Sequence, residues 1–97
     1  MRRAARTDRN HAEIVKGLRR SGCTVLDLSS VGCGCPDILV GRAGHNWLFE
    51  IKDGAKPPSA RKLTAPEQSF FESWRGNVQV VNSLQEAIDA INETILK

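Results

Sequence analysis

Three charged side chains stand at the ends of apolar segments where an ordinary strand would carry none. Asp37 directly precedes one apolar run, and Glu50 and Lys52 lie two residues apart within a second run. Side chains alternate across a strand, so Glu50 and Lys52 would share one face. If the two runs pair as a hairpin, Asp37 lies roughly opposite them. Because a lone ion is costly to remove from water, two carboxylates and one ammonium at one end of a sheet indicate a functional site.

These groups suit a hard divalent cation. Mg²⁺ or Mn²⁺ prefers oxygen ligands, which the two carboxylates and the backbone carbonyl of Ile51 would supply. Such a cation makes water more acidic, and Lys52 would stabilise negative charge that builds on a phosphate. The spacing therefore favours phosphodiester hydrolysis. An ordinary exposed ion pair on an edge strand, preceded by a Pro-Asp turn, accounts for the same spacing about equally well.

The composition indicates one small intracellular domain. The chain has 97 residues, a net charge of +3 and a pI near 9.0, which suits a polyanionic partner. Three cysteines are too few, and odd in number, for a disulfide framework, so a reducing, cytoplasmic location is expected. No apolar run approaches the ~20 residues that span a bilayer, and the basic N-terminus lacks the apolar segment of a signal peptide. We expect no membrane association and no small-molecule cofactor.

The elements that must position the charged groups are predicted from apolar periodicity and from helix caps. A basic arm over residues 1–9 precedes a single domain, residues 10–97. The predicted helices cover about 8–20, 64–75 and 83–95, and the predicted strands cover 23–28, 38–40, 46–52 and 78–81. The first three strands follow one another closely and should form an antiparallel meander. The fourth follows a helical crossover and should lie parallel to a neighbour, giving a mixed sheet flanked by helices.

Other residues have plainer interpretations. Phe70, Phe71 and Trp74 recur at helical spacing, so we expect them in the core, with a dimer interface as the alternative. His11 is expected to be a partly exposed helix residue and His45 a turn residue. Neither histidine has the spacing of a metal ligand, and the cysteines lack the fourth ligand of a structural zinc site.

The ordered set of residues resembles a known family. Pro36-Asp37 followed by Glu50-Ile51-Lys52 is similar to the PD-(D/E)XK motif of restriction-endonuclease-like nucleases, and more narrowly to the small stand-alone VRR-Nuc domains of phages and bacteria. The similarity extends over nearly the whole chain after the arm. Further matching positions are Glu13, Gly22, Val40-Gly41, Leu63-Thr64, Gln68 and Val80 to Ser83.

The resemblance implies an α/β fold, with a restriction-endonuclease-like αβββαβ core and one more C-terminal helix. It implies Asp37, Glu50 and the Ile51 carbonyl as metal ligands, and Lys52 as the catalytic lysine. Glu13 would reach the metal directly or through water, and Gln68 would lie near the scissile phosphate. Stand-alone members are associated with homodimers that cut branched DNA such as four-way (Holliday) junctions.

Three functions remain open from the sequence. The first is a Mg²⁺- or Mn²⁺-dependent DNA endonuclease acting on structured DNA as a homodimer. The second is a non-catalytic module on the same fold that binds structured nucleic acid, and the third is a protein-interaction domain. The motif favours the first, because a pure DNA-binding module would not need two carboxylates that repel phosphate. The residues expected to contact nucleic acid are Arg2, Arg3, Arg6, Lys56, Arg61 and Lys62.

Overall fold

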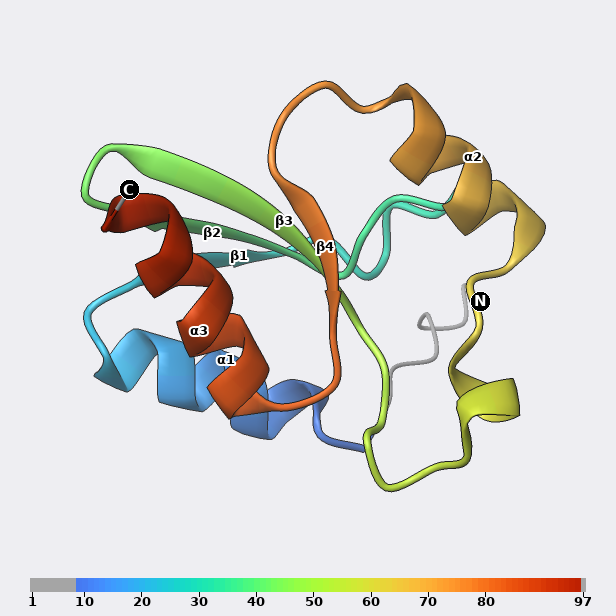
Figure 1. Ribbon diagram of the computed structural model, residues 1–97, viewed down its shortest axis with the longest axis horizontal. Coiled ribbons are helices and arrows are strands. Elements are labelled where there is room, and N and C mark those ends of the chain that lie inside the picture. Colours follow the sequence, from blue (N-terminus) through green and yellow to red (C-terminus); the bar gives the residue numbers. More distant parts are fainter. Residues whose placement is uncertain (1–8, 97) are drawn as a thin grey trace.

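The computed structural model, which describes residues 9–96, is a four-stranded sheet with helices packed against it (Figure 1). Its elements are α1 (His11–Arg20), β1 (Thr24–Asp27), β2 (Ile38–Arg42), β3 (His45–Ile51), the 3₁₀ helix η1 (Pro58–Arg61), α2 (Ala65–Ser73), β4 (Val78–Val81) and α3 (Leu84–Ile95). The predicted order and the α/β class are confirmed, with η1 as an addition. The predicted caps Thr7 and Asp8, and all of the arm except Arg9, lie outside the described residues. None of the helices within 9–96 has the length and apolar character to cross a membrane.

The sheet has the mixed topology that the sequence predicts. The strands lie in the order β1-β2-β3-β4, with β1, β2 and β3 antiparallel and β4 parallel to β3. The hairpin between β2 and β3 turns at Ala43 and Gly44, which both have positive φ, 52° and 80°. Two such residues in succession match the right-handed twist of the flanking strands. The turn therefore fixes the register that sets Ile38 opposite Phe49.

Helices α1 and α3 lie side by side across one face of the sheet, which we call the inner face (Figure 1). Their apolar stripes meet alternate residues of the strands, as the 3.6-residue and two-residue periods require. The side chains that bury this face are Ile14, Leu18, Ile38, Val40, Trp47, Phe49, Ile51, Val81, Ala87, Ala90 and Ile91. This single layer is the hydrophobic core of the domain.

Helix α2 lies apart from the other two helices, on the opposite side of the sheet (Figure 1). Its start agrees with the prediction, because Thr64 and Glu67 form a complete capping box. The expectation that its aromatic residues fill the core is wrong. Phe70 and Phe71 are half-buried, Trp74 is 48% exposed, and no residue of α2 is buried. The inner face is already filled by α1 and α3, so the aromatic side chains of α2 pack on one another, with Phe70 and Trp74 stacked at 5.2 Å.

Candidate active site

The outer face of the sheet changes from apolar to charged along the strands. Leu39 and Leu48 are paired across β2 and β3, and they belong to an apolar row on this face. Two residue pairs further on, and so on the same face, the register that sets Ile38 opposite Phe49 brings Asp37 opposite Glu50. The Phe49 carbonyl accepts a hydrogen bond from the Asp37 N–H at 3.0 Å, which closes the ladder at this end. The two carboxylates therefore meet because the hairpin has this register.

The position of Glu50 differs from that of an exposed ion pair on an edge strand. β3 is an interior strand, and Glu50 is only 4% exposed. Burial, followed by the nearby Asp37 and Glu67 carboxylates, raises the pKa of Glu50 to about 9. Burial also raises the pKa of Asp37, although its Oδ2 accepts a hydrogen bond from the Ile51 N–H at 2.7 Å. Two neighbouring carboxyl groups that resist ionisation form a site in which a cation would be strongly favoured.

Lys52 is fixed by two carboxylates. Its Nζ lies 3.1 Å from Oε1 of Glu67 and 3.6 Å from Oε2 of Glu50. Glu67 uses the same Oε1 to accept a hydrogen bond from the Thr64 N–H at 2.8 Å. These contacts outweigh the effect of burial and hold the pKa of Glu67 below its usual value. The N-terminus of α2 thus orients the lysine of the motif.

Glu67 is a site residue that the sequence reasoning missed. The family resemblance assigned a functional role to the neighbouring residue, Gln68. In the structure, Gln68 is exposed and its Nε2 donates a hydrogen bond to Glu72 at 3.1 Å. The spacing of Thr64 and Glu67 was the available signal. In a capping box the Glu side chain folds back to the start of its own helix, and here that end of α2 lies next to Lys52.

The loop before Asp37 allows α2 to approach the sheet this closely. A Cβ on Gly34 would stand 2.3 Å from the Pro66 carbonyl oxygen and 2.9 Å from the Glu67 nitrogen. Gly34 also has a positive φ of 79°, a conformation that glycine adopts without strain. This glycine therefore sets the distance between the loop and the helix that carries Glu67.

His11 is a second residue whose position the sequence did not predict. It is only 7% exposed, so the expectation of a partly exposed residue is wrong. It lies close enough to Asp27 and Asp37 to interact electrostatically with both carboxyl groups. Its spacing of three and seven from Ile14 and Leu18 was the signal, because these positions form the buried face of α1.

Comparison with known proteins agrees with this geometry. No family model and no curated protein matches the chain. One solved structure, described as a VRR_NUC domain, matches with a TM-score of 0.58 and 29% sequence identity. The match covers 86% of this chain and 95% of that one. The chain is a VRR-Nuc domain. It therefore has a nuclease-type, restriction-endonuclease-like α/β fold.

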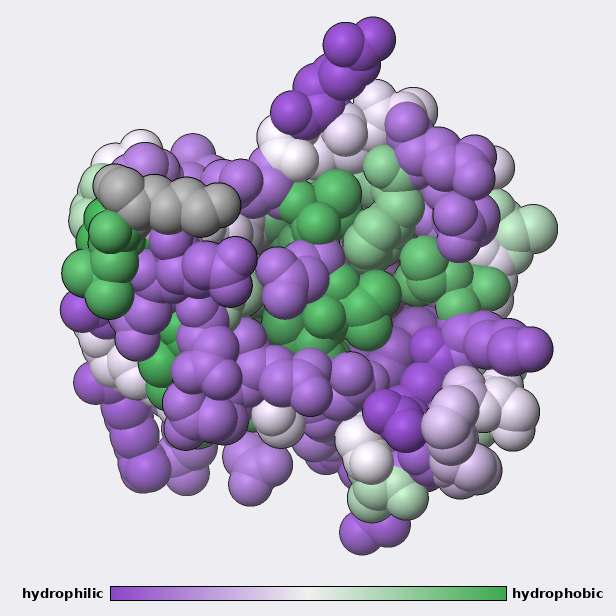
Figure 2. Space-filling view, viewed as in Figure 1, coloured by the Kyte–Doolittle hydropathy of each residue, from purple (hydrophilic) through white to green (hydrophobic). Residues whose placement is uncertain are grey.

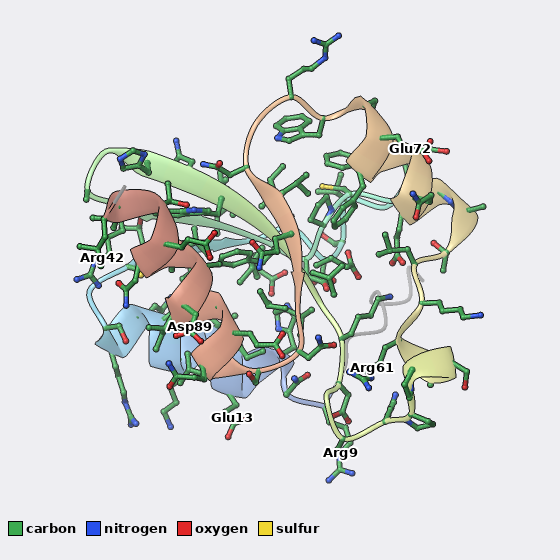
Figure 3. All side chains as sticks on the ribbon, viewed as in Figure 1. Arg9, Glu13, Arg42, Arg61, Glu72 and Asp89 are labelled. Atoms are coloured by element: carbon green, nitrogen blue, oxygen red, sulfur yellow. The ribbon has the colours of Figure 1, made fainter. Side chains whose placement is uncertain are left out.

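The first-helix acid of this VRR-Nuc domain lies away from the carboxylate pair. Glu13 is exposed on α1 and points outward from the body of the molecule (Figure 3). It lines a polar hollow with Asn10 and Asp53, and Asp37 is not among the residues that line this hollow. The structure thus brings together Asp37, Glu50, Ile51 and Lys52 but not Glu13 or Gln68.

The residues that would hold a metal ion in this VRR-Nuc domain are few. Within residues 9–96, no group of three or more His, Cys, Asp or Glu side chains has an arrangement that would hold a metal ion. A cation would therefore rely on the two carboxylates of Asp37 and Glu50 with a backbone carbonyl, such as that of Ile51. This oxygen set fits Mg²⁺ or Mn²⁺, which keep several water ligands.

The basic residues expected to contact nucleic acid divide between two parts of the chain. Arg2, Arg3 and Arg6 lie outside the described residues. Lys56 and Lys62 are exposed on the loop that follows β3, on either side of η1. Arg61, at the end of η1, is half-buried and lines the polar hollow beside Asp53 (Figure 3).

Proposed function

We propose that this VRR-Nuc domain is a divalent-metal-dependent DNA endonuclease that hydrolyses phosphodiester bonds in branched DNA, including four-way junctions, as a homodimer. The observation that carries the proposal is the buried Glu50 with the half-buried Asp37 opposite it, next to Lys52. Buried carboxylates without a compensating cation only destabilise a small domain. Binding of Mg²⁺ or Mn²⁺ by these carboxylates would offset the unfavourable free energy of burying them.

The protein's own groups have distinct roles in this proposal. Asp37 and Glu50, with the Ile51 carbonyl, would hold the cation, which would make water more acidic and neutralise phosphate charge. Lys52 donates hydrogen bonds to the attacking water or to a phosphate oxygen, and stabilises the negative charge of the transition state. Glu67 keeps the Lys52 ammonium pointed at the carboxylate pair through the 3.1 Å contact. Glu13 and Gln68 take no direct part in these steps.

DNA is the proposed substrate because the surroundings of the site are basic. Lys56 and Lys62 extend from the loop that leaves β3 immediately after Lys52. Contacts of this kind bind the phosphate backbone and set register rather than sequence. The arginines of the arm, Arg2, Arg3 and Arg6, would add to the same interaction. The three free thiols suit a reducing cytoplasm.

A homodimer is supported by the apolar surface on the α2 side of the sheet. Hydrophobic side chains gather between α2 and β4 in the space-filling view (Figure 2). At the end of α2, the half-buried Phe70 stacks on Trp74, which is itself exposed. Exposed apolar patches of this kind commonly mark protein interfaces. A two-fold dimer would hold two sites for paired cuts on a symmetric junction.

The test is cleavage of a labelled four-way junction, with duplex and flap DNA of the same sequence, in EDTA, Mg²⁺ or Mn²⁺. We expect the junction to be cut only with metal, and the Asp37→Asn and Lys52→Ala variants to bind it without cutting it. Loss of one hydrogen-bond donor to the transition state slows a reaction by a factor on the order of 10²–10³. The cleavage rate of Lys52→Ala should therefore be reduced by at least that factor.

Two outcomes would overturn the proposal. Cutting by Lys52→Ala at the wild-type rate would show that the motif lysine is not used, or that a contaminant is responsible. Binding of the junction without cutting in any metal would instead support the non-catalytic binding module. Dimerisation is tested separately by light scattering of the wild type and of Trp74→Ser. A wild-type mass equal to one chain would exclude the dimer.

A further inference from the structure

A hollow of about 540 Å³ lies between α1 and β1, outside the carboxylate site. Its lining is mainly apolar, with Ala12 and Val15 among its residues. Lys16, Arg19 and Arg20 are the cations that border it. We call this feature the α1 groove. The chemistry proposed above makes no use of it.

The charge of the α1 groove is strongly biased to positive. Asp27 is its one acidic lining residue within the described chain. Hydrogen bonds from Ser29 to its side chain lower the pKa of Asp27 and occupy that carboxylate at 2.6 and 2.8 Å. Arg19 also has a structural contact, because its Nη2 donates to the Val25 carbonyl oxygen at 3.1 Å. Lys16 and Arg20, one helical turn apart, are exposed on the same side of α1.

The groove runs between the two ends of the sheet. His11 lines it at the end where Asp27 and Asp37 lie, and Arg20 lines it at the other. Beyond Arg20, the Arg42 side chain reaches the end of α1 and donates a hydrogen bond to the Ser21 carbonyl oxygen. Figure 3 shows Arg42 at the end of the sheet away from α2. A helix of this length extends roughly 15 Å, so the cations form a track that leads away from the carboxylate site.

The floor of the groove also contains an unsatisfied polar group. His11 is more than nine-tenths buried, and its Nε2 has no hydrogen-bond partner within residues 9–96. Buried polar groups normally have a hydrogen-bond partner. An unpaired nitrogen in the lining of a cavity therefore indicates that a bound group supplies the missing hydrogen bond.

We propose that the α1 groove is a second DNA-binding subsite, which holds the phosphodiester backbone of a duplex arm that is not being cut. An apolar floor with a cationic rim suits the deoxyribose and phosphate groups of a backbone, and these contacts carry no sequence information. The proposal rests on the proposed function, because it assigns the substrate a second arm. It explains how a domain with one carboxylate site distinguishes branched from linear DNA.

The experiment is a binding titration of the full chain with a fluorescent four-way junction in EDTA, between 50 and 200 mM salt. The double variant Lys16→Gln/Arg20→Gln is compared with the wild type, because both residues are exposed on the surface of α1. Arg75→Gln, in the exposed turn between α2 and β4, is the control for loss of a surface cation. The same proteins are titrated with a junction whose arms are trimmed to a few base pairs.

We expect the double variant to bind the long-armed junction about tenfold or more weakly at 100 mM salt. Its slope of log affinity against log salt should fall by up to about 1.8, since each lost phosphate contact removes about 0.9. The affinity for the trimmed junction should differ much less between the double variant and the wild type. Arg75→Gln should change the affinity for either junction by less than threefold.

If the double variant bound the long-armed junction as tightly as Arg75→Gln does, the proposed role of the α1 groove would be overturned, while the nuclease proposal would stay intact. Equal losses on long and trimmed junctions would also overturn it, because the cations would then not act on an arm. A wild type that neither binds nor cuts the junction would overturn both proposals. Melting curves of each variant by circular dichroism separate these outcomes from misfolding.

Discussion

The two faces of the same sheet are built for different purposes. The inner face buries Phe49 and Ile51 against α1 and α3, within the hydrophobic core of the domain. The outer face buries Glu50 between those two residues in the sequence, with α2 as its cover. Because side chains alternate along a strand, the apolar side chains of β3 that stabilise the fold lie next to Glu50, whose burial is unfavourable. Changes on the two faces should have opposite consequences.

The largest expected effect is on the inner face. Phe49 is fully buried in the core, so Phe49→Ala should lower the free energy of unfolding by about 3–5 kcal/mol, which is a large part of the ~5–15 kcal/mol of a typical domain. Urea denaturation followed by circular dichroism would measure it. A loss below about 1 kcal/mol would mean that the inner face is not the main core.

On the outer face, replacement of an ionisable side chain by a neutral one should stabilise the fold above about pH 5. Since the folded pKa of Glu50 is about 9 and the usual value is 4.5, the folded state keeps a proton that the unfolded chain releases between these pH values. Stability of the wild type in EDTA should therefore fall as pH rises from about 4.5 to 9, by up to roughly 1.4 kcal/mol per pH unit. Glu50→Gln should show a smaller fall, because only the raised pKa of Asp37 then remains, and it should lose cleavage.

Urea midpoints of both proteins at pH 5, 7 and 8.5 would check this difference. The two curves should nearly coincide at the lowest pH and separate as the pH rises. Asp89→Asn, which removes an exposed carboxylate of α3, is the control. If Glu50→Gln were less stable than the wild type at pH 8.5, the Glu50 carboxylate would stabilise the fold, and its burial would not be an unfavourable feature kept for the site.

A smaller effect is expected where the loop meets α2. Gly34→Ala adds a Cβ against the Pro66 carbonyl oxygen at a residue with positive φ, so α2 must move or the loop must change. We expect about 1–3 kcal/mol of destabilisation and a larger loss of cleavage, because Glu67 would no longer fix Lys52. Gly32→Ala is the control, since Gly32 also has a positive φ but its Cβ would meet no atom within 4 Å. Equal cleavage by both variants would exclude this role for Gly34.

The smallest effect is expected at the exposed edge of the outer face. Leu26 on β1 is 57% exposed and lies opposite Leu39. Leu26→Ala should change the unfolding free energy by less than about 1 kcal/mol, as most exposed positions do. Chemical denaturation of this variant next to Phe49→Ala would sharpen the contrast between the faces. A cost near that of Phe49→Ala would mean that the outer face is covered in solution, as a dimer would require.

Several parts of this arrangement were predictable from local sequence. The capping box at Thr64 fixes where α2 starts, and the Ala43-Gly44 turn gives β2 and β3 a defined register. From that register, the proximity of Asp37 to Glu50 follows by counting residues. These predictions depend on interactions between residues close in the chain, where periodicity and turn chemistry decide the conformation.

Other parts were not predictable because they depend on competition between distant elements. The aromatic residues of α2 have the spacing of a core helix, and they are excluded only because α1 and α3 fill the inner face. The same sequence pattern thus fits a buried or an exposed helix. The choice of Glu67 over its neighbour Gln68 likewise depends on the rotation of α2, which the close contact at Gly34 sets.

By itself, the sequence determined the order of elements, the mixed sheet and the meeting of Asp37, Glu50 and Lys52 at one end of it. Only the tertiary structure decided that Glu67 holds the lysine, that His11 is buried beside the aspartates and that Glu13 lies away from them. The physical reason is the range of the interactions. Strand alternation and turn geometry act over a few residues, whereas the depth of a carboxylate and its pKa depend on which elements fold over it.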